Sequence, residues 1–151
     1  MNKKIWLDMD GTFVDLYGVK NWLQKLESYD PSPYKEATPL VNLSTFARTL
    51  NKLKKDGWEI NIVTWTSKKS CESYDEAVKK EKLNYVAKHL PSVKFDKIKV
   101  LKYGTPKSSV GTGILFDDEL RNREEWKGLA CSQKNLIKKL NCLVKKENVI
   151  K

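Results

Sequence analysis

The chain has 151 residues, of which 40% are hydrophobic, 10% aromatic and 32% charged. This length fits one domain, and the apolar fraction suffices for a buried core, which excludes a wholly disordered chain. The 29 Lys and Arg residues outnumber the 19 Asp and Glu residues, and the resulting net charge of +10 indicates either anionic partners or a solubilising, lysine-rich surface.

In the first half of the chain, apolar runs alternate with helical spacings. A short apolar run at residues 4–9, which ends in acidic residues, predicts the first strand. Apolar side chains at helical spacing predict a helix over residues 42–56, and Gly57 follows it where helices commonly end. The run at residues 58–63 predicts a second strand that ends at Thr64, and Pro91 ends a helical pattern over residues 72–90.

The second half continues this alternation. Apolar alternation predicts a third strand at residues 95–101, a fourth at 113–116 and a short fifth at 128–131. Ser132 is placed to cap a last helix. Strands separated by helices are typical of βαβ units, so the sequence predicts an α/β fold: one Rossmann-like domain over residues 1–151 with a mainly parallel sheet flanked by helices.

Residues 16–41 do not fit the repeat. They contain a short helical pattern at residues 20–28 and a proline-rich turn at residues 30–33. We expect this insertion to form a small cap that acts as a lid over the top of the sheet, with a packing loop as the alternative.

Several classes of protein are excluded by what the sequence contains. No apolar run approaches the roughly 18–20 residues of a membrane span, and the apolar patch after Lys4 stops at Asp8, too soon for a secretory signal. We therefore expect a cytoplasmic protein with no membrane partner. Three cysteines without a CxxC pair argue against a disulfide framework or a zinc knuckle, and the single histidine, His89, cannot build a histidine-based metal site.

Acidic and other polar side chains stand where the predicted strands end. Asp8 and Asp10 follow the first strand, Thr64 ends the second, and a second acidic pair follows the fourth at Asp117 and Asp118. The carboxyl ends of parallel strands meet at the edge where such folds bind ligands. Clustered carboxylates repel one another unless a cation joins them, and Mg²⁺ prefers oxygen ligands, so we expect a magnesium site.

This pattern suits phosphoryl transfer. A carboxylate beside a metal can attack phosphorus, and an acid two residues further along an extended segment points the same way and can serve as general acid and base. Thr64, together with Lys107 from the loop before the fourth strand, can hold the remaining phosphoryl oxygens.

The same residues carry a family resemblance. Residues 8–15 (DMDGTFVD) resemble the first motif of the haloacid dehalogenase-like hydrolase superfamily, and residues 60–64, Lys107 and residues 115–118 resemble its second, third and fourth motifs, in family order. The resemblance implies that Asp8 is the nucleophile and a magnesium ligand. Asp10 would be the general acid/base and would lend its backbone carbonyl to the metal. The other implied roles are phosphate binding by Thr64 and Lys107 and metal binding by Asp117 and Asp118.

A finer resemblance concerns the substrate. Residues 82–91, residues 95–98 and the position of Lys107 ten residues before Asp117 are similar to the 5′(3′)-deoxyribonucleotidase branch and its small bacterial and phage-like relatives. That branch implies hydrolysis of nucleoside monophosphates. Trp22 and Tyr17 in the cap and Trp65 beside Thr64 are candidates to stack on a base, although aromatic side chains more often pack in cores.

Three functions therefore stand as hypotheses. The first is a magnesium-dependent 5′-nucleotidase for small nucleotides, and the second is a phosphatase for 5′- or 3′-phosphorylated nucleic-acid ends or for another small phosphomonoester. In the second, a strand would follow the basic surface, including the lysines of residues 129–151, at positions 134, 138, 139, 145, 146 and 151. The third is a binding or regulatory protein on a degenerate phosphatase fold, which the complete set of catalytic residues disfavours.

Overall fold

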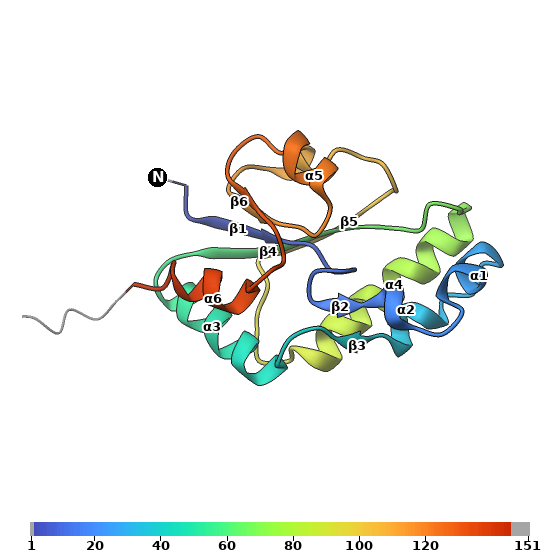
Figure 1. The fold of residues 1–151 in the computed structure, drawn as a ribbon, viewed down its shortest axis with the longest axis horizontal. Helices are drawn as coiled ribbons and strands as arrows, with labels where there is room; N and C mark the ends of the chain where they lie inside the picture. Colours follow the sequence, from blue (N-terminus) through green and yellow to red (C-terminus); the bar gives the residue numbers. More distant parts are fainter. Residues whose placement is uncertain (1, 146–151) are drawn as a thin grey trace, which may run out of the picture.

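The structure, a computed structural model, describes residues 2–145 and is built around a five-stranded parallel sheet (Figure 1). The strand order is β5-β4-β1-β6-β7, and every pair of neighbours is parallel. The strands are β1 (Lys4–Leu7), β4 (Glu59–Trp65), β5 (Lys97–Leu101), β6 (Ile114–Phe116) and β7 (Ala130–Cys131). The predicted α/β, Rossmann-like fold is thereby confirmed.

Strand β1 lies at the centre because both of its faces are apolar. Ile5 and Leu7 belong to the main core, whereas Trp6 belongs to a second cluster on the opposite face, and all three are fully buried. The chain first builds outward from β1 to β4 and β5, and then returns to place β6 on the other side of β1. This reversal of strand order creates the crevice in which such sheets bind ligands.

Helices cover both faces of the sheet (Figure 1). On one side lie α3 (Leu43–Lys55), α4 (Glu72–His89) and α6 (Leu136–Asn141), whose apolar side chains meet β1 and β4 in the main core. On the other side lies the short α5 (Leu120–Glu125). Helix α3 begins where the Asn42 side chain accepts a hydrogen bond from the Thr45 backbone N–H at 3.0 Å, which satisfies one of the free donors of the first turn.

The insertion after β1 forms a small cap against α4. It contains β2 (Val14–Asp15), the 3₁₀ turn η1 (Leu16–Gly18), α1 (Trp22–Glu27), α2 (Ser32–Glu36) and β3 (Thr38–Pro39), and β2 pairs with β3. Leu16, Leu26 and Tyr34 of the cap pack with Tyr74 and Val78 of α4 in a separate apolar cluster. The cap therefore packs on the helix that follows β4, while Val14 and Ala37 belong to the main core beside the sheet.

Two local predictions differ from the structure, and one helix was not predicted. The proline-rich turn at residues 30–33 leads into α2, because Pro33 stands in the first turn, where a helix tolerates proline. Ser132 does not cap the last helix. That helix begins four residues later, after Asn135, and the Ser132 backbone and hydroxyl oxygens instead accept hydrogen bonds from Lys139 Nζ, both at 3.0 Å. Helix α5 has no counterpart in the prediction.

No helix within residues 2–145 is long and apolar enough to cross a membrane. The three cysteines, Cys71, Cys131 and Cys142, are all free thiols. Of the lysines singled out near the end of the chain, Lys146 and Lys151 lie outside the described residues.

Candidate active site

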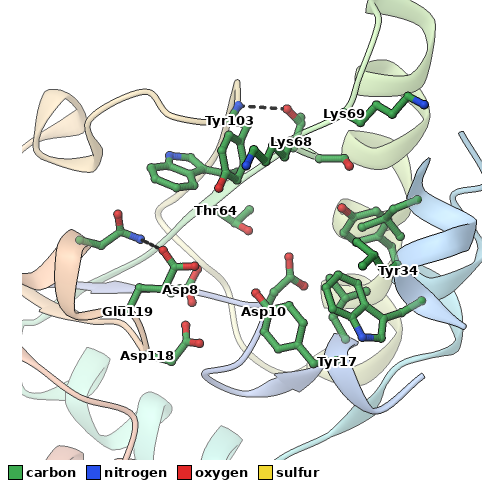
Figure 2. A pocket seen from close by; sticks show the side chains of 18 of the residues that line it. Asp8, Asp10, Tyr17, Tyr34, Thr64, Lys68, Lys69, Tyr103, Asp118 and Glu119 are labelled. Atoms are coloured by element: carbon green, nitrogen blue, oxygen red, sulfur yellow. Dashed lines mark hydrogen bonds between the residues drawn. The ribbon is translucent and has the colours of Figure 1, made fainter. Parts of the chain in front are cut away.

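The polar ends of three neighbouring strands meet in one cavity of about 620 Å³ (Figure 2). Asp8 follows β1, Thr64 lies near the end of β4, and Asp117 follows β6, so each side chain is carried to the same edge by a buried strand. All three are buried. The cavity lining contains every predicted site residue: Asp8, Asp10, Tyr17, Trp22, Thr64, Trp65, Lys107, Asp117 and Asp118.

A tight turn directs both acids of the first motif toward this cavity. The Met9 carbonyl accepts hydrogen bonds from the backbone N–H groups of Thr12, Phe13 and Val14 at 3.0, 3.1 and 3.0 Å, which folds the chain back directly after β1. Gly11 within the turn has φ +82°, and a Cβ there would overlap the carboxylate of Asp118. Glycine is therefore needed at this position both for the backbone conformation and for the close approach of the fourth-motif acid.

Lys107 joins Asp8, which follows β1, to Asp117, which follows β6. Its Nζ lies 2.8 Å from Asp8 Oδ1 and 2.7 Å from Asp117 Oδ2, and it is 5% exposed. Burial alone would lower the pKa of Lys107, but Asp8 and Asp117 outweigh it and raise the pKa well above its usual value, so the ammonium stays charged. The Thr12 hydroxyl donates to Asp8 Oδ2 at 2.9 Å, so both oxygens of Asp8 are held in place.

Asp117 is fixed by its own neighbours. Its Oδ1 accepts the Glu119 backbone N–H at 2.9 Å, and its Oδ2 accepts the Asn122 side-chain amide at 3.2 Å. Arg123 donates to the Asp117 backbone carbonyl at 2.9 Å. Glu119 and the two helical residues come from the start of α5, which explains why this short, unpredicted helix belongs to the site.

Three carboxylates converge closely enough to share one cation. One oxygen each of Asp8, Asp117 and Asp118 lies within 4.8 Å of the others. Burial, followed by the charge of Asp8, raises the pKa of Asp117 to about 6 and that of Asp118 to about 9. An excess of buried acid in an all-oxygen donor set fits a hard divalent cation such as Mg²⁺. The Asp10 side chain lies outside this cluster, so any metal contact by Asp10 falls to its backbone carbonyl.

A second buried lysine, Lys82, is the main site residue that the sequence analysis missed. Its Nζ donates to Asp10 Oδ2 at 2.8 Å, to the Thr64 hydroxyl at 2.5 Å and to the Trp65 carbonyl at 2.7 Å. Lys82 is 1% exposed and comes from the middle of α4. Burial raises the pKa of Asp10, and the ion pair with Lys82 opposes this shift without cancelling it.

The sequence did hold a signal for Lys82. The buried positions of α4 include Tyr74, Val78, Tyr85 and Val86, and Lys82 lies on the same helical face, four residues after Val78. A charged side chain on the apolar face of a helix is seldom buried without a partner, and here the partner is Asp10. Among the residues that the structure describes, Lys82 and Lys107 are the only buried lysines.

Aromatic side chains form the outer walls of the cavity. On the cap side Tyr17 and Trp22 pack edge to face, with ring centroids 4.9 Å apart. On the opposite wall Trp65 packs on Tyr103 at 4.9 Å, while its indole N–H donates to the Thr105 carbonyl at 2.8 Å. The Trp65 ring also lies 5.3 Å from Lys107 Nζ, so Tyr103, 43% exposed, offers the freer surface.

The mouth of the cavity carries charges that the sequence analysis did not single out. Lys68 and Lys69 follow Trp65 by three and four residues, and Glu119 stands beside the acidic cluster. Figure 2 shows Lys68 reaching toward Tyr103 above Thr64, whereas Lys69 points away. Lys69 instead lies over the ring of Tyr29 from the cap, at 5.7 Å.

Comparison with protein-family models and with curated proteins gives no match to this chain. The functional interpretation of the cavity therefore depends on its geometry and chemistry.

Proposed function

We propose that the protein is a magnesium-dependent phosphomonoesterase that hydrolyses nucleoside monophosphates, foremost deoxyribonucleotides, through an aspartyl-phosphate on Asp8. The observation that carries this proposal is one arrangement of charges. Two acids from one turn, Asp8 and Asp10, open into the same cavity, and each is paired with its own buried lysine, at 2.8 Å in both cases. A nucleophile and an acid/base catalyst held in this way suit transfer of a phosphoryl group to a carboxylate.

In the first step, an Asp8 oxygen attacks phosphorus, an Asp8–phosphorus bond forms and the ester oxygen leaves. Lys107 and the Thr12 hydroxyl hold the two Asp8 oxygens before the attack. Asp10 protonates the leaving oxygen, a task that its raised pKa favours. In the second step, Asp10 takes a proton from a water molecule that attacks the aspartyl-phosphate, which releases inorganic phosphate and restores Asp8.

The phosphoryl oxygens are held by Thr64, Lys82 and Lys107 in this proposal. All three N–H groups of Lys82 already have acceptors, so a phosphoryl oxygen binds there only by replacing one of them. Asp10 is the acceptor to be replaced, because it must turn toward the leaving group. When bound, the magnesium ion supplies positive charge that offsets the carboxylates and the phosphoryl group. Asp8, Asp117 and Asp118 would hold it.

The leaving group would occupy the aromatic part of the cavity. A volume of about 620 Å³ exceeds what a phosphate alone requires, and the walls offer Tyr17, Trp22, Trp65 and Tyr103 for stacking on a base. These features support a nucleotide over a small aliphatic phosphate. We place this activity in the cytoplasm, where the three free thiols would remain reduced.

The test is a panel of 5′- and 3′-nucleoside monophosphates, 5′- and 3′-phosphorylated oligonucleotides and sugar phosphates, assayed for released phosphate. We expect turnover of mononucleotides that is lost in excess chelator and restored by Mg²⁺, with Ca²⁺ a poor replacement. Asp8→Asn should abolish turnover. Asp56→Asn, at the far end of α3, is the control and should retain it. If purified Asp8→Asn turned over substrate at a rate close to that of the unaltered protein, the assignment of Asp8 as the nucleophile would be refuted.

The net charge of +10 favours one alternative, a phosphatase for nucleic-acid ends. The same panel separates the two, since that enzyme would prefer phosphorylated oligonucleotides to mononucleotides.

A further inference from the structure

The cap contacts the phosphate site directly, through one buried side chain. Tyr34 lies in α2 of the cap and is only 4% exposed. The face of its ring lies 5.2 Å from Nζ of Lys82, the lysine that binds Asp10 and Thr64. Figure 2 shows Tyr34 at the cap wall of the cavity, across from Thr64.

Three hydrogen-bond acceptors surround the Lys82 ammonium, and the Tyr34 ring covers its remaining side. The ammonium donates to three oxygens, from Asp10, Thr64 and the Trp65 backbone, and Tyr34 covers it from the cap. An ammonium over an aromatic face is attracted by the negative charge of the ring, and the attraction grows when water is excluded. Lys82 is 1% exposed, so water is excluded from its contact with the Tyr34 ring.

Tyr34 is itself held in position from both sides. The ring packs in the apolar cluster that joins the cap to α4, together with Leu26 and Tyr74. A ring fixed by the cap and by α4 is poised to hold the ammonium with little freedom.

We infer that Tyr34 is a positioning residue for Lys82, so that cap helix α2 forms part of the phosphate site in addition to facing the leaving group. The inference rests on the proposed function, in which Lys82 holds a phosphoryl oxygen. When the phosphoryl group displaces Asp10, Lys82 loses its one ionic partner within the protein. The Tyr34 ring then keeps the ammonium aimed at Thr64 and the phosphoryl group. A cap lifted from α4 would leave Lys82 without this support and weaken phosphate binding.

The experiment measures binding of inorganic phosphate by calorimetry in the presence of Mg²⁺, together with kcat and KM for an aryl phosphate. Tyr34→Leu removes the ring and should raise the phosphate dissociation constant and KM by about tenfold. Tyr34→Phe keeps the ring face and should stay within about twofold of the unaltered protein. Phe95→Leu is the control, because it removes a ring that packs against the main core and not in the cap cluster, and it should leave phosphate affinity unchanged.

A replacement of nearly constant shape guards against misfolding of Tyr34→Leu. Tyr34→pentafluorophenylalanine reverses the charge distribution of the ring, and it should weaken phosphate binding at least as much as Tyr34→Leu does. Unchanged phosphate affinity in the fluorinated variant overturns the inference. So does an equal loss in Phe95→Leu, which would assign the effect to a general loss of packing. If the unaltered protein binds no phosphate, both the proposed function and this inference are refuted. If it binds phosphate but the Tyr34 substitutions do not change the affinity, only this inference is refuted.

Discussion

Asp8 and Asp10 differ in chemistry because their neighbours differ. Asp8 is held between Lys107 and the Thr12 hydroxyl, and both of its oxygens accept hydrogen bonds. Asp10 has the single ion pair with Lys82, and its side chain remains 16% exposed toward the cavity. A carboxylate held on both oxygens suits in-line attack, whereas one with a single replaceable partner suits a catalyst that must move between leaving group and water.

This difference predicts that the loss of activity in Asp10→Asn depends on the leaving group of the substrate. With a nucleotide, whose alkoxide needs a proton, kcat should fall by about 10²- to 10⁴-fold. With p-nitrophenyl phosphate, whose phenolate leaves unprotonated, the first step should survive while hydrolysis of the aspartyl-phosphate slows. Rapid-mixing measurements should then show a burst of nitrophenolate that matches the enzyme concentration. Equal losses on both substrates without a burst would contradict the assignment of Asp10.

Gly11 offers a second test at the scale of single residues. Gly11→Ala forces an alanine into φ +82° and drives its Cβ into the Asp118 carboxylate. We expect the loss of Mg²⁺-induced thermal stabilisation and at least a tenfold loss of activity. Gly104→Ala is the control: its φ is +88°, but a Cβ there meets nothing within 4 Å. It should share the backbone strain of about 1–2 kcal/mol while keeping the response to Mg²⁺. A full Mg²⁺ response in Gly11→Ala would show that the close approach is unimportant.

At the scale of secondary-structure elements, the buried strands were the most predictable part of the molecule. After their first residues, β1 is a continuous apolar run, and β4 is an apolar run interrupted only by the buried Asn61 before Thr64. Asp8 follows β1 and Thr64 lies near the end of β4, so the pattern locates both the strand and the site residue at its end. Asp8, Thr64 and Asp117 therefore came to the same cavity as predicted. The rule that ligands bind at the carboxyl ends of parallel strands is sufficient to predict the position of these three residues.

The elements that were missed have weak local signals. Helix α5 is six residues long and follows the acidic pair without a side-chain cap, yet it supplies Asn122 and Arg123 to hold Asp117. Lys82 stands in a helix rich in exposed lysines. In the sequence only its place on the apolar face, four residues after Val78, distinguishes it, and its contacts with Asp10 and Thr64 appear only in the fold. Such contacts join distant segments, so chain pattern alone does not reveal them.

Asp96 makes an element-scale prediction about stability. Its Oδ2 accepts the Ile60 backbone N–H at 2.8 Å and lies 2.9 Å from Lys54 Nζ, so it joins β4 to α3. Burial acts to raise the pKa of Asp96, but these hydrogen bonds and Lys54 outweigh it, and the folded-state pKa is lowered. The stability from this group is thus present above the unfolded pKa of about 3.9 and is lost as pH falls through the folded value.

Asp96→Asn should accordingly lower the free energy of unfolding at pH 7 by about 0.2–1 kcal/mol, the range for a partly exposed ion pair. The difference between the two proteins should be nearly full at pH 5 and should shrink as the pH falls below about 3.9, because the carboxyl is protonated first in the unfolded state and at lower pH in the folded state. Urea unfolding at pH 7, 5 and 3 measures this change. A difference that stays constant over that pH range would show that the charge of Asp96 contributes nothing.

At the scale of the whole molecule, the charges are unevenly arranged. The net charge is +10, yet the inner end of the cavity gathers Asp8, Asp10, Asp117 and Asp118 around two buried lysines. The excess of lysine therefore lies on the outside. Lys138 of α6 lines a second hollow of about 710 Å³, which also touches Asp118 and Tyr17 of the candidate site. At this hollow the lysine-rich end of the chain approaches the candidate site.

The last prediction asks whether this basic surface serves the substrate. Neutralising Lys138, Lys139, Lys145 and Lys146 together, each to glutamine, should change mononucleotide kcat/KM by less than about twofold, because in the proposed mechanism Thr64, Lys82 and Lys107 hold the phosphate in the cavity. Tyr103→Ala should instead raise KM for nucleotides, since stacking on a base is worth about 1–3 kcal/mol, and it should affect an aryl phosphate less.

An enzyme for nucleic-acid ends would behave in the opposite way. Its oligonucleotide turnover would fall steeply with salt, and the loss of each phosphate-contacting lysine would reduce the slope of log kcat/KM against log salt by about 0.7. The control neutralises four exposed lysines elsewhere, Lys52, Lys55, Lys94 and Lys99, and so removes the same charge. The two quadruple-lysine variants and Tyr103→Ala are assayed on mononucleotides and on 5′-phosphorylated oligonucleotides, each at two salt concentrations. One outcome would favour an end-processing phosphatase over a nucleotidase: the variant at Lys138, Lys139, Lys145 and Lys146 loses oligonucleotide turnover selectively, while Tyr103→Ala is unaffected. The substrate would then be held along α6 and not by the aromatic walls.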